Sequence, residues 1–198
     1  VPSATVALPY SQTLSGSGGS GPYTFAVTAG ALPAGLSLAP GGSLSGTPTA
    51  GGTFTFTATA TDSSPAPGPF TGSQAYTLVV TAPTIVLPAT TLTAAAIGTS
   101  YSATLDAATG GTPTYSYAVT GGALPAGVTL TSATRALSGT PTQAGAFSFT
   151  VTATDSSTGT GPYTGTQTYS LVVGAPTIVV NPATLPNGQV GVAINQAI

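Results

Sequence analysis

The side chains that could do chemistry in this chain are few. Its charged residues are Asp62, Asp106, Asp155 and Arg135, and it contains no Lys, His, Cys, Met or Trp. General acid–base and nucleophilic catalysis need positioned carboxylates, imidazoles, amines or thiols. Asp62 and Asp155 occupy equivalent places in two copies of an internal repeat, so they cannot form a carboxylate pair within one domain. We therefore expect no catalytic residues and no enzymatic activity.

The composition excludes several classes of partner. Charged residues make up 2% of the 198 residues, against roughly 25% in ordinary soluble domains. One cation cannot neutralise a row of phosphates or hold an anionic membrane surface, so no nucleic-acid partner is expected. No apolar run approaches the ~20 residues of a spanning helix, so no membrane insertion is expected. The absence of Cys excludes disulfides and thiolate metal sites, and we expect no cofactor.

Asp106 and Arg135 have no charged equivalent in the other repeat. Ser15 stands opposite Asp106, and a surface turn is the simplest interpretation of this aspartate. Arg135 lies in the loop 130–136, and a lone exposed arginine is usually solvated and contributes little energy. Because these are the main differences between the two repeats, they are also where a specific binding surface would be sought.

Several motifs of the chain occur twice, in the same order. GALPAGLSL at 30–38 returns as GALPAGVTL at 122–130, and GPFTGSQAYTLVVTAPTIV at 68–86 returns as GPYTGTQTYSLVVGAPTIV at 161–179. Self-similarity at a fixed period is the signature of tandem domains. We predict a first repeat at 1–82 that lacks its first strand, a second repeat at 83–174, and the first strand and start of a further repeat at 175–198.

The hydrophobic pattern predicts that each repeat is built of β-strands. In the segment 53–61, apolar residues and Thr alternate strictly, which is the period of a strand with one buried face. Gly and Pro clusters separate further candidates at 10–14, 22–28, 76–80 and 84–87, and no stretch has helical periodicity. Several short strands per repeat indicate a sandwich. The side chains expected to face the core are Phe54, Phe56, Ala58 and Ala60 in the first repeat and Phe147, Phe149, Val151 and Ala153 in the second.

The two repeats are joined without a flexible linker. Residues 79–86 read Val-Val-Thr-Ala-Pro-Thr-Ile-Val, so the last strand of one domain is expected to run almost directly into the first strand of the next. Proline fixes its own φ and restricts the residue before it, so a joint at Ala82 and Pro83 is short and stiff. We therefore predict an extended, semi-rigid rod.

These motifs resemble the immunoglobulin-like repeats of large bacterial surface proteins, which are related to cadherin-like domains of the dystroglycan type. The resemblance rests on LPAGLSL, LSGTPT, AGGTFTFTATATDSS and QAYTLVV in the first repeat and on LPAGVTL, LSGTPT, AGAFSFTVTATDSS and QTYSLVV in the second. It implies an all-β fold of tandem immunoglobulin-like β-sandwich domains in an extracellular or cell-surface protein. Such proteins are often adhesins, and the resemblance implies no single ligand.

Two interpretations remain for Asp62 and Asp155, which both stand in Thr-Asp-Ser-Ser. Related cadherin-like modules can bind calcium near domain junctions, so the resemblance suggests a calcium ligand. Ca²⁺ takes about 6–8 oxygens, usually with several carboxylates, whereas each repeat supplies one here. The alternative is a turn after the strand, in which the carboxylate accepts backbone N–H bonds. We expect the turn and no metal site.

The aromatic side chains divide into two groups. Phe70 and Tyr163 stand in the loop-like sequences GPFTG and GPYTG, and we expect them to make exposed contacts between repeats or with a neighbouring chain. The others recur at strand spacing, so packing in or beside the core is expected and a carbohydrate-stacking platform is the alternative. This second group is Tyr23, Phe25, Tyr76, Tyr115, Tyr117 and Tyr169.

The scarcity of charge also bears on assembly. Edge strands normally carry Lys or other charges that prevent pairing with another chain, and a surface with few charges repels its copies weakly. We expect copies of the chain to associate. Two interpretations remain for 175–198: it donates a strand to the first repeat of a neighbour, or the sequence is a section of a longer continuous array. The predicted function is a structural repeat unit of an extracellular bacterial filament, fibre or surface stalk. The alternative is an adhesin module that binds a glycan or a host protein.

Overall fold

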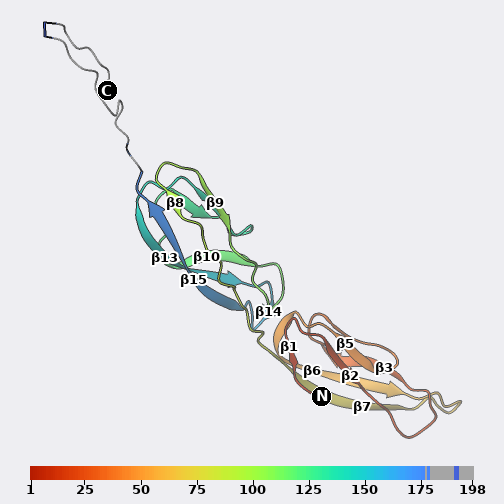
Figure 1. The fold of residues 1–198 in the computed structure, drawn as a ribbon. Helices are drawn as coiled ribbons and strands as arrows, with labels where there is room; N and C mark the ends of the chain where they lie inside the picture. The colour runs from red at the N-terminus through yellow and green to blue at the C-terminus, as the bar shows by residue number, and fades with distance from the viewer. Residues whose placement is uncertain (177, 179–189, 192–198) are drawn as a thin grey trace.

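The computed structural model describes residues 1–176, 178, 190 and 191. Their strands form two β-sandwiches that lie end to end (Figure 1). No α-helix occurs among these residues. They therefore contain no helix that could cross a membrane. The predicted all-β architecture of tandem sandwiches in an extended rod is confirmed, whereas the predicted start of a further repeat at 175–198 lies almost entirely outside the described residues.

The first sandwich is built around a long antiparallel hairpin. β6 and β7 pair from Gly52 opposite Val80 to Thr61 opposite Thr71. β1 runs parallel to β7 at one side and β3 runs antiparallel to β6 at the other, while β2, β5 and β4 form the second sheet. The strands are β1 (Ala4–Thr5), β2 (Tyr10–Thr13), β3 (Thr24–Gly30), β4 (Leu36–Leu38), β5 (Ser43–Gly46), β6 (Ala50–Thr61) and β7 (Thr71–Thr81).

The second sandwich repeats this topology. β8, β15, β13 and β10 form one sheet in that order, and β9, β12 and β11 form the other. β8 runs parallel to β15 just as β1 runs parallel to β7. The strands are β8 (Ala95–Ala96), β9 (Tyr101–Thr104), β10 (Ser116–Gly122), β11 (Val128–Leu130), β12 (Ala136–Gly139), β13 (Gly145–Thr154), β14 (Thr158–Gly159) and β15 (Thr164–Gly174).

The alternation along β6 and β13 turns one side of each strand to the core, as the sequence predicts. Thr side chains occupy the other side and are exposed or half-buried. Hydrophobic clusters fill the space between the two sheets of each sandwich. Of the predicted core residues, those that are buried are Phe56, Ala58, Phe149, Val151 and Ala153, and those that are half-buried are Phe54, Ala60 and Phe147.

The predicted strand at 84–87 is wrong as a ladder strand. It makes an isolated antiparallel bridge between Val86 and Thr109, and the first ladder strand of the second sandwich is β8. Pro83 and Pro88 flank the segment and have no N–H to donate, which prevents a longer ladder. The side chains of Ile85 and Leu87 are nevertheless buried in the core of the second sandwich, whereas that of Val86 is exposed. The linker between the sandwiches is therefore also part of the second core.

A second contact joins the two sandwiches. β14 pairs in parallel with the first residues of β6. The N–H groups of Thr158 and Thr160 donate to the carbonyl oxygens of Thr49 and Gly51, both at 3.0 Å. Tyr163 packs against the hydrophobic clusters of both sandwiches. The junction thus has two backbone attachments, the linker and β14, and Figure 1 shows β14 beside the end of the first sandwich.

Gly159 allows the role of β14 to be tested. Its φ is +71°, and a Cβ at this position would overlap the backbone of Gly51. Gly98 is a matched control, because its φ is +74° and a Cβ there would meet nothing within 4 Å. Gly159→Val and Gly98→Val share a backbone strain of about 1–2 kcal/mol, and Gly159→Val alone disturbs the junction.

We expect Gly159→Val to loosen the two sandwiches relative to one another. Spin labels on Thr55→Cys and Thr129→Cys, one in each sandwich, report the distance distribution by double electron–electron resonance. The distribution should broaden in Gly159→Val and stay narrow in Gly98→Val. Equal distributions in both variants would mean that the linker alone sets the junction.

Candidate functional site

Asp155 follows β13 and closes a loop with its carboxylate. The Oδ1 atom accepts a hydrogen bond from the N–H of Tyr163 at 2.7 Å, and Oδ2 accepts one from the N–H of Thr112 at 3.0 Å. The Ser157 hydroxyl lies 2.6 and 2.7 Å from the two oxygens. The N–H of Ser157 adds a further bond at 3.3 Å. One carboxylate therefore fixes three stretches of backbone, which is the predicted turn.

Asp62 repeats this arrangement after β6. Its carboxylate accepts hydrogen bonds from the N–H groups of Phe70 at 2.7 Å and Ser20 at 3.1 Å, and from the Ser64 hydroxyl. Gly19, with φ +71°, passes so close to the carboxylate that a Cβ there would overlap it. The loop thus requires both the aspartate and a glycine in the left-handed region.

Hydrogen bonding lowers the pKa of both carboxyl groups. Bonds from the Ser64 hydroxyl and the Phe70 N–H lower the pKa of Asp62 from 3.8 to about 2. Burial raises the pKa of Asp155, but bonds from the Ser157 hydroxyl and the Tyr163 N–H outweigh it, and the net direction is downward. Both aspartates are therefore ionised at neutral pH and act as fixed acceptors rather than as general acids.

The calcium hypothesis finds little further support in the geometry. The oxygens of Asp62 and Asp155 already accept several protein hydrogen bonds each. Among the described residues, no group of three or more His, Cys, Asp or Glu side chains could hold a metal ion. A calcium ion at either aspartate would need its other ligands from carbonyls, hydroxyls and water.

Arg135 is only partly exposed, contrary to expectation. Its side chain is half-buried, and its guanidinium carbon lies 6.0 Å from the ring centroid of Tyr117. Such cation–π contacts contribute about 0.5–1 kcal/mol at exposed sites. The N–H of Tyr117 donates to the carbonyl of Ser132 at 3.1 Å, which brings the ring under the loop that carries Arg135. Sequence spacing could not predict this contact, because the loop and the strand are paired only in the fold.

Asp106 lies on the surface, as predicted. Its carboxylate accepts a hydrogen bond from the Thr90 hydroxyl at 2.8 Å, and its N–H donates to the same hydroxyl oxygen at 3.0 Å. Thr90 belongs to the connection between β7 and β8. The pair therefore ties the linker to the second sandwich and is a structural contact rather than a binding site.

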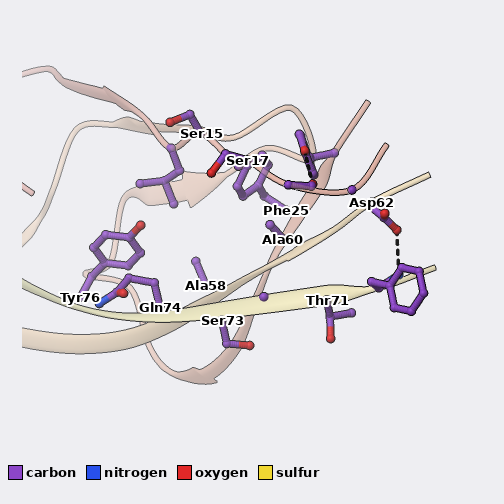
Figure 2. Close-up of a pocket in the computed structure, with 17 residues that line it drawn as sticks. Ser15, Ser17, Phe25, Ala58, Ala60, Asp62, Thr71, Ser73, Gln74 and Tyr76 are labelled. Atoms are coloured by element: carbon purple, nitrogen blue, oxygen red, sulfur yellow. Dashed lines mark hydrogen bonds between the residues drawn. The ribbon is translucent and has the colours of Figure 1, made fainter. Parts of the chain in front are cut away.

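A groove of about 430 Å³ opens along one side of the first sandwich. Its walls are the loop at 15–19 and the beginning of β7. Figure 2 shows Tyr76 at one end and Asp62 at the other, with Phe25, Ala58 and Ala60 between them. An apolar floor beside a carboxylate that is already hydrogen-bonded suits an apolar chain segment or a sugar ring better than a charged ligand.

The predicted aromatic core is confirmed most fully in the second sandwich. Tyr117 and Tyr169 are buried there, Tyr169 stacks on Phe149 with 5.9 Å between ring centroids, and the hydroxyl of Tyr117 accepts a bond from Ala108. In the first sandwich Tyr76 stacks on Phe56 at 5.5 Å. There, however, the aromatic residues that line the groove are only half-buried, namely Tyr23, Phe25 and Tyr76.

The two aromatic residues expected to make exposed contacts have different surroundings. Tyr163 contacts both sandwiches, as predicted for a contact between repeats, and its hydroxyl lies 2.7 Å from that of Thr160. Its equivalent Phe70 stands at the rim of the groove and is 58% exposed. The groove and Phe70 together form the candidate site, and the alternating pattern of the strands gave no indication of the groove.

Comparison with known proteins identifies both sandwiches. The model of the family described as "Putative Ig domain" matches residues 1–81 and 83–174. No curated protein matches the chain.

Solved structures of extracellular domains also match the chain, at low sequence identity and low TM-score. Extracellular cadherin domains 1–5 of protocadherin gamma B2 share 16% identity over 86% of this chain and 34% of theirs, with a TM-score of 0.38. Domains EC22–24 of mouse cadherin-23 share 18% identity over 78% of this chain and 53% of theirs, with a TM-score of 0.35. Extracellular domains 3–5 of Drosophila OTK share 14% identity over 87% of this chain and 58% of theirs, with a TM-score of 0.37. The chain spans less than two thirds of each of these structures.

The aspartate turns predict acid-labile stability. A carboxyl group whose pKa is lowered on folding stabilises the folded state fully above its unfolded pKa, here 3.8, and loses this contribution as the pH falls through its folded pKa of about 2. The free energy of unfolding, measured in urea, should therefore fall as the pH is lowered from about 5 to about 2, a range that brackets the unfolded and folded pKa values.

The Asp62→Asn and Asp155→Asn double variant should be less stable at pH 7 and should lose most of this pH dependence. Asp106→Asn is the matched control and should keep it, because both turns are intact. Equal pH slopes in the wild type and the double variant would contradict the role assigned to the turns.

Proposed function

Because the chain belongs to the putative Ig domain family, with a match across both sandwiches, we propose that it is a structural repeat unit of an extracellular bacterial filament, fibre or surface stalk. In this proposal its role is mechanical. Copies associate through the ends of their sandwiches and through strand edges. The observation that carries the proposal is the junction between the two sandwiches, which joins unlike ends of two domains that share one topology.

The junction supports an assembly that grows in one direction. One end of the first sandwich, at the start of β6, contacts the opposite end of the second, at β14 and Tyr163. Contacts between unlike surfaces that do not close into a ring generate filaments. The equivalent end of the second sandwich exposes residues 142–146. A further sandwich can therefore dock at this end of the described chain.

The scarcity of charged side chains on the surface favours association between copies of the chain. Three carboxylates and one guanidinium are the charged side chains of the chain, so copies repel one another weakly. A single arginine offers trypsin-like proteases one target, and the absence of Met and Cys removes the oxidisable side chains. These properties suit a long-lived extracellular structure and no enzymatic reaction.

An adhesin module is the alternative function. The groove with its aromatic floor favours it, because sugar rings and apolar peptides bind to such surfaces. The equivalent place in the second sandwich is occupied by the protein's own linker, however. A groove that another part of the same chain can fill is better explained by assembly than by recognition of a host ligand.

Negative-stain electron microscopy of the concentrated, non-denatured protein tests the proposal. We expect unbranched filaments whose length increases with protein concentration. Monomeric two-domain rods that bind oligosaccharides in a glycan array would favour the adhesin function instead. Monomeric rods without such binding would contradict both functions.

A further inference from the structure

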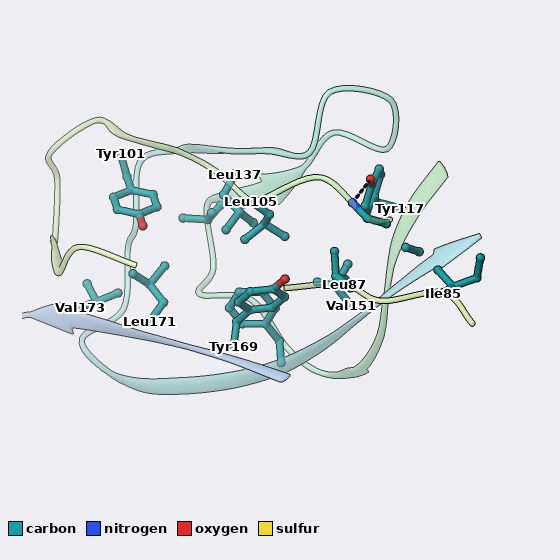
Figure 3. Packing of buried hydrophobic residues seen from close by; sticks show 14 residues of the cluster. Ile85, Leu87, Tyr101, Leu105, Tyr117, Leu137, Val151, Tyr169, Leu171 and Val173 are labelled. Carbon is teal, nitrogen blue, oxygen red and sulfur yellow. Dashed lines mark hydrogen bonds between the residues drawn. The ribbon is translucent and has the colours of Figure 1, made fainter. Parts of the chain in front are cut away.

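In the second sandwich, the place that corresponds to the groove is filled by residues 84–88. Ile85 and Leu87 are buried in the core, and Figure 3 shows them on the segment that crosses the sandwich beside Val151 and Tyr169. The Val86 N–H donates to the Thr109 carbonyl at 2.9 Å, and the Thr109 N–H donates back at 2.8 Å. The Tyr169 hydroxyl donates to the carbonyl of Pro88 at 2.8 Å.

The first sandwich keeps the groups that receive such a segment. Tyr76 corresponds to Tyr169, and Ser17 corresponds to Thr109. Within the described residues the backbone of Ser17 makes no hydrogen bond. Gly72 corresponds to Gly165, where a Cβ would overlap the backbone of Ile85. A Cβ on Gly72 would meet nothing within 4 Å, so the groove has room for such a segment.

The chain contains a second copy of the segment that fills the groove. Ala-Pro-Thr-Ile-Val occurs at 82–86, where it leaves the first sandwich, and again at 175–179, where it leaves the second. Ile85 is 8% exposed in the core of the next sandwich, whereas its equivalent Ile178 is 85% exposed. Ile178 is therefore an exposed apolar side chain, and the groove of the first sandwich is open among the described residues.

The surfaces that would meet beside the groove are also complementary. In the described junction a Cβ on Gly51 would overlap the hydroxyl of Tyr163, so a glycine faces a tyrosine. At the exposed end of the second sandwich, Ala144 stands in place of Gly51. At the rim of the groove, Phe70 stands in place of Tyr163. The methyl group added on one side matches the hydroxyl group removed on the other.

We propose that residues 177–181 of one copy of this chain fill the groove of a second copy, with Ala144 of the first against Phe70 of the second. The proposal rests on the assembly described under the proposed function and specifies its contact. In this contact the backbone of Val179 forms hydrogen bonds with the backbone of Ser17, and the carbonyl oxygen of Asn181 accepts a hydrogen bond from the hydroxyl of Tyr76. Ile178 enters the core beside Ala60.

This contact differs from the described junction in one respect. Pro65 and Pro67 stand where Thr158 and Thr160 donate their N–H groups to the neighbouring sandwich. Proline has no N–H, so the β14 attachment cannot form between copies. The contact between copies therefore depends on the groove, and blocking the groove should abolish it.

Cysteine cross-linking tests the contact directly, because the chain has no cysteine of its own. Under oxidising conditions, Ser17→Cys with Val179→Cys should give a ladder of dimers, trimers and longer oligomers on a non-reducing gel. The single variants should give no species above the dimer. Val86→Cys with Thr109→Cys is the matched control for geometry and should cross-link within one chain, at the mobility of the monomer.

Filling the groove tests the same contact without cysteine chemistry. In the wild-type background, Gly72→Val should lower the apparent association constant by about tenfold or more, while circular dichroism and thermal unfolding show an intact fold. Gly41→Val is the control, since a Cβ at Gly41 also meets nothing within 4 Å and this residue does not line the groove.

A compensating pair tests the proposed neighbour of Phe70. Phe70→Tyr should weaken association about tenfold, because the added hydroxyl meets the methyl group of Ala144. Phe70→Tyr with Ala144→Gly should restore it to within about threefold. A purely structural role of Phe70 predicts no rescue from a residue at the other end of the chain.

The outcomes separate this contact from the proposed function. Filaments that persist in Gly72→Val, with no ladder from the cysteine pair, would overturn the contact and leave the filament function standing. A ladder without filaments in the microscope would support the contact and contradict the filament. Neither ladder nor filaments would overturn both proposals.

Discussion

Burial of the linker segment in the next sandwich is the interaction on which the arrangement of this molecule depends. Ile85 and Leu87 belong to the connection between the domains, yet they lie in the core of the second one. Complete burial of such side chains is worth about 1.5–3 kcal/mol each. The same residues that stabilise the second sandwich therefore also fix where it sits after the first. Folding of the second domain therefore also orders the linker that places it, with no contribution from ion pairs or disulfides.

The sequence predicted the features that repeat along a strand and missed those that depend on contacts between segments. The alternation in β6 and β13 was sufficient to find the core face, because a period of two has one structural meaning. The segment 84–87 was correctly found to be apolar, but its flanking prolines make it a core-filling connection rather than a ladder strand. Arg135 over Tyr117 and β14 beside β6 join residues distant in sequence. No local pattern encodes them.

The aspartate turns explain how a chain with so few charges positions its loops. Each carboxylate accepts N–H bonds from the end of its strand, from the start of the following hairpin strand and from the loop after Gly19 or its equivalent. Charge-assisted hydrogen bonds of this kind are stronger than neutral ones. One negative charge in each sandwich therefore orders the loop that leads to Phe70 or Tyr163, the residues at the junction surfaces. The chemistry of the candidate site begins with these turns, in which each aspartate acts as a hydrogen-bond acceptor.

The differences between two otherwise similar repeats lie at the surfaces that meet in the internal junction and in the proposed contact between copies. A perfect repeat would make the junction within the chain and the contact between chains identical. Here Thr158 and Thr160 give the internal junction two backbone hydrogen bonds, and prolines at the equivalent positions withhold them from the other contact. Gly51 facing Tyr163, and Ala144 with Phe70, assign each surface its own partner by size. In the proposed assembly, the internal junction keeps its backbone attachment, and the contact between copies relies on a donated apolar segment. Because the donor and the groove lie on different sandwiches, a copy that gives its segment still has an open groove, and growth can continue in one direction.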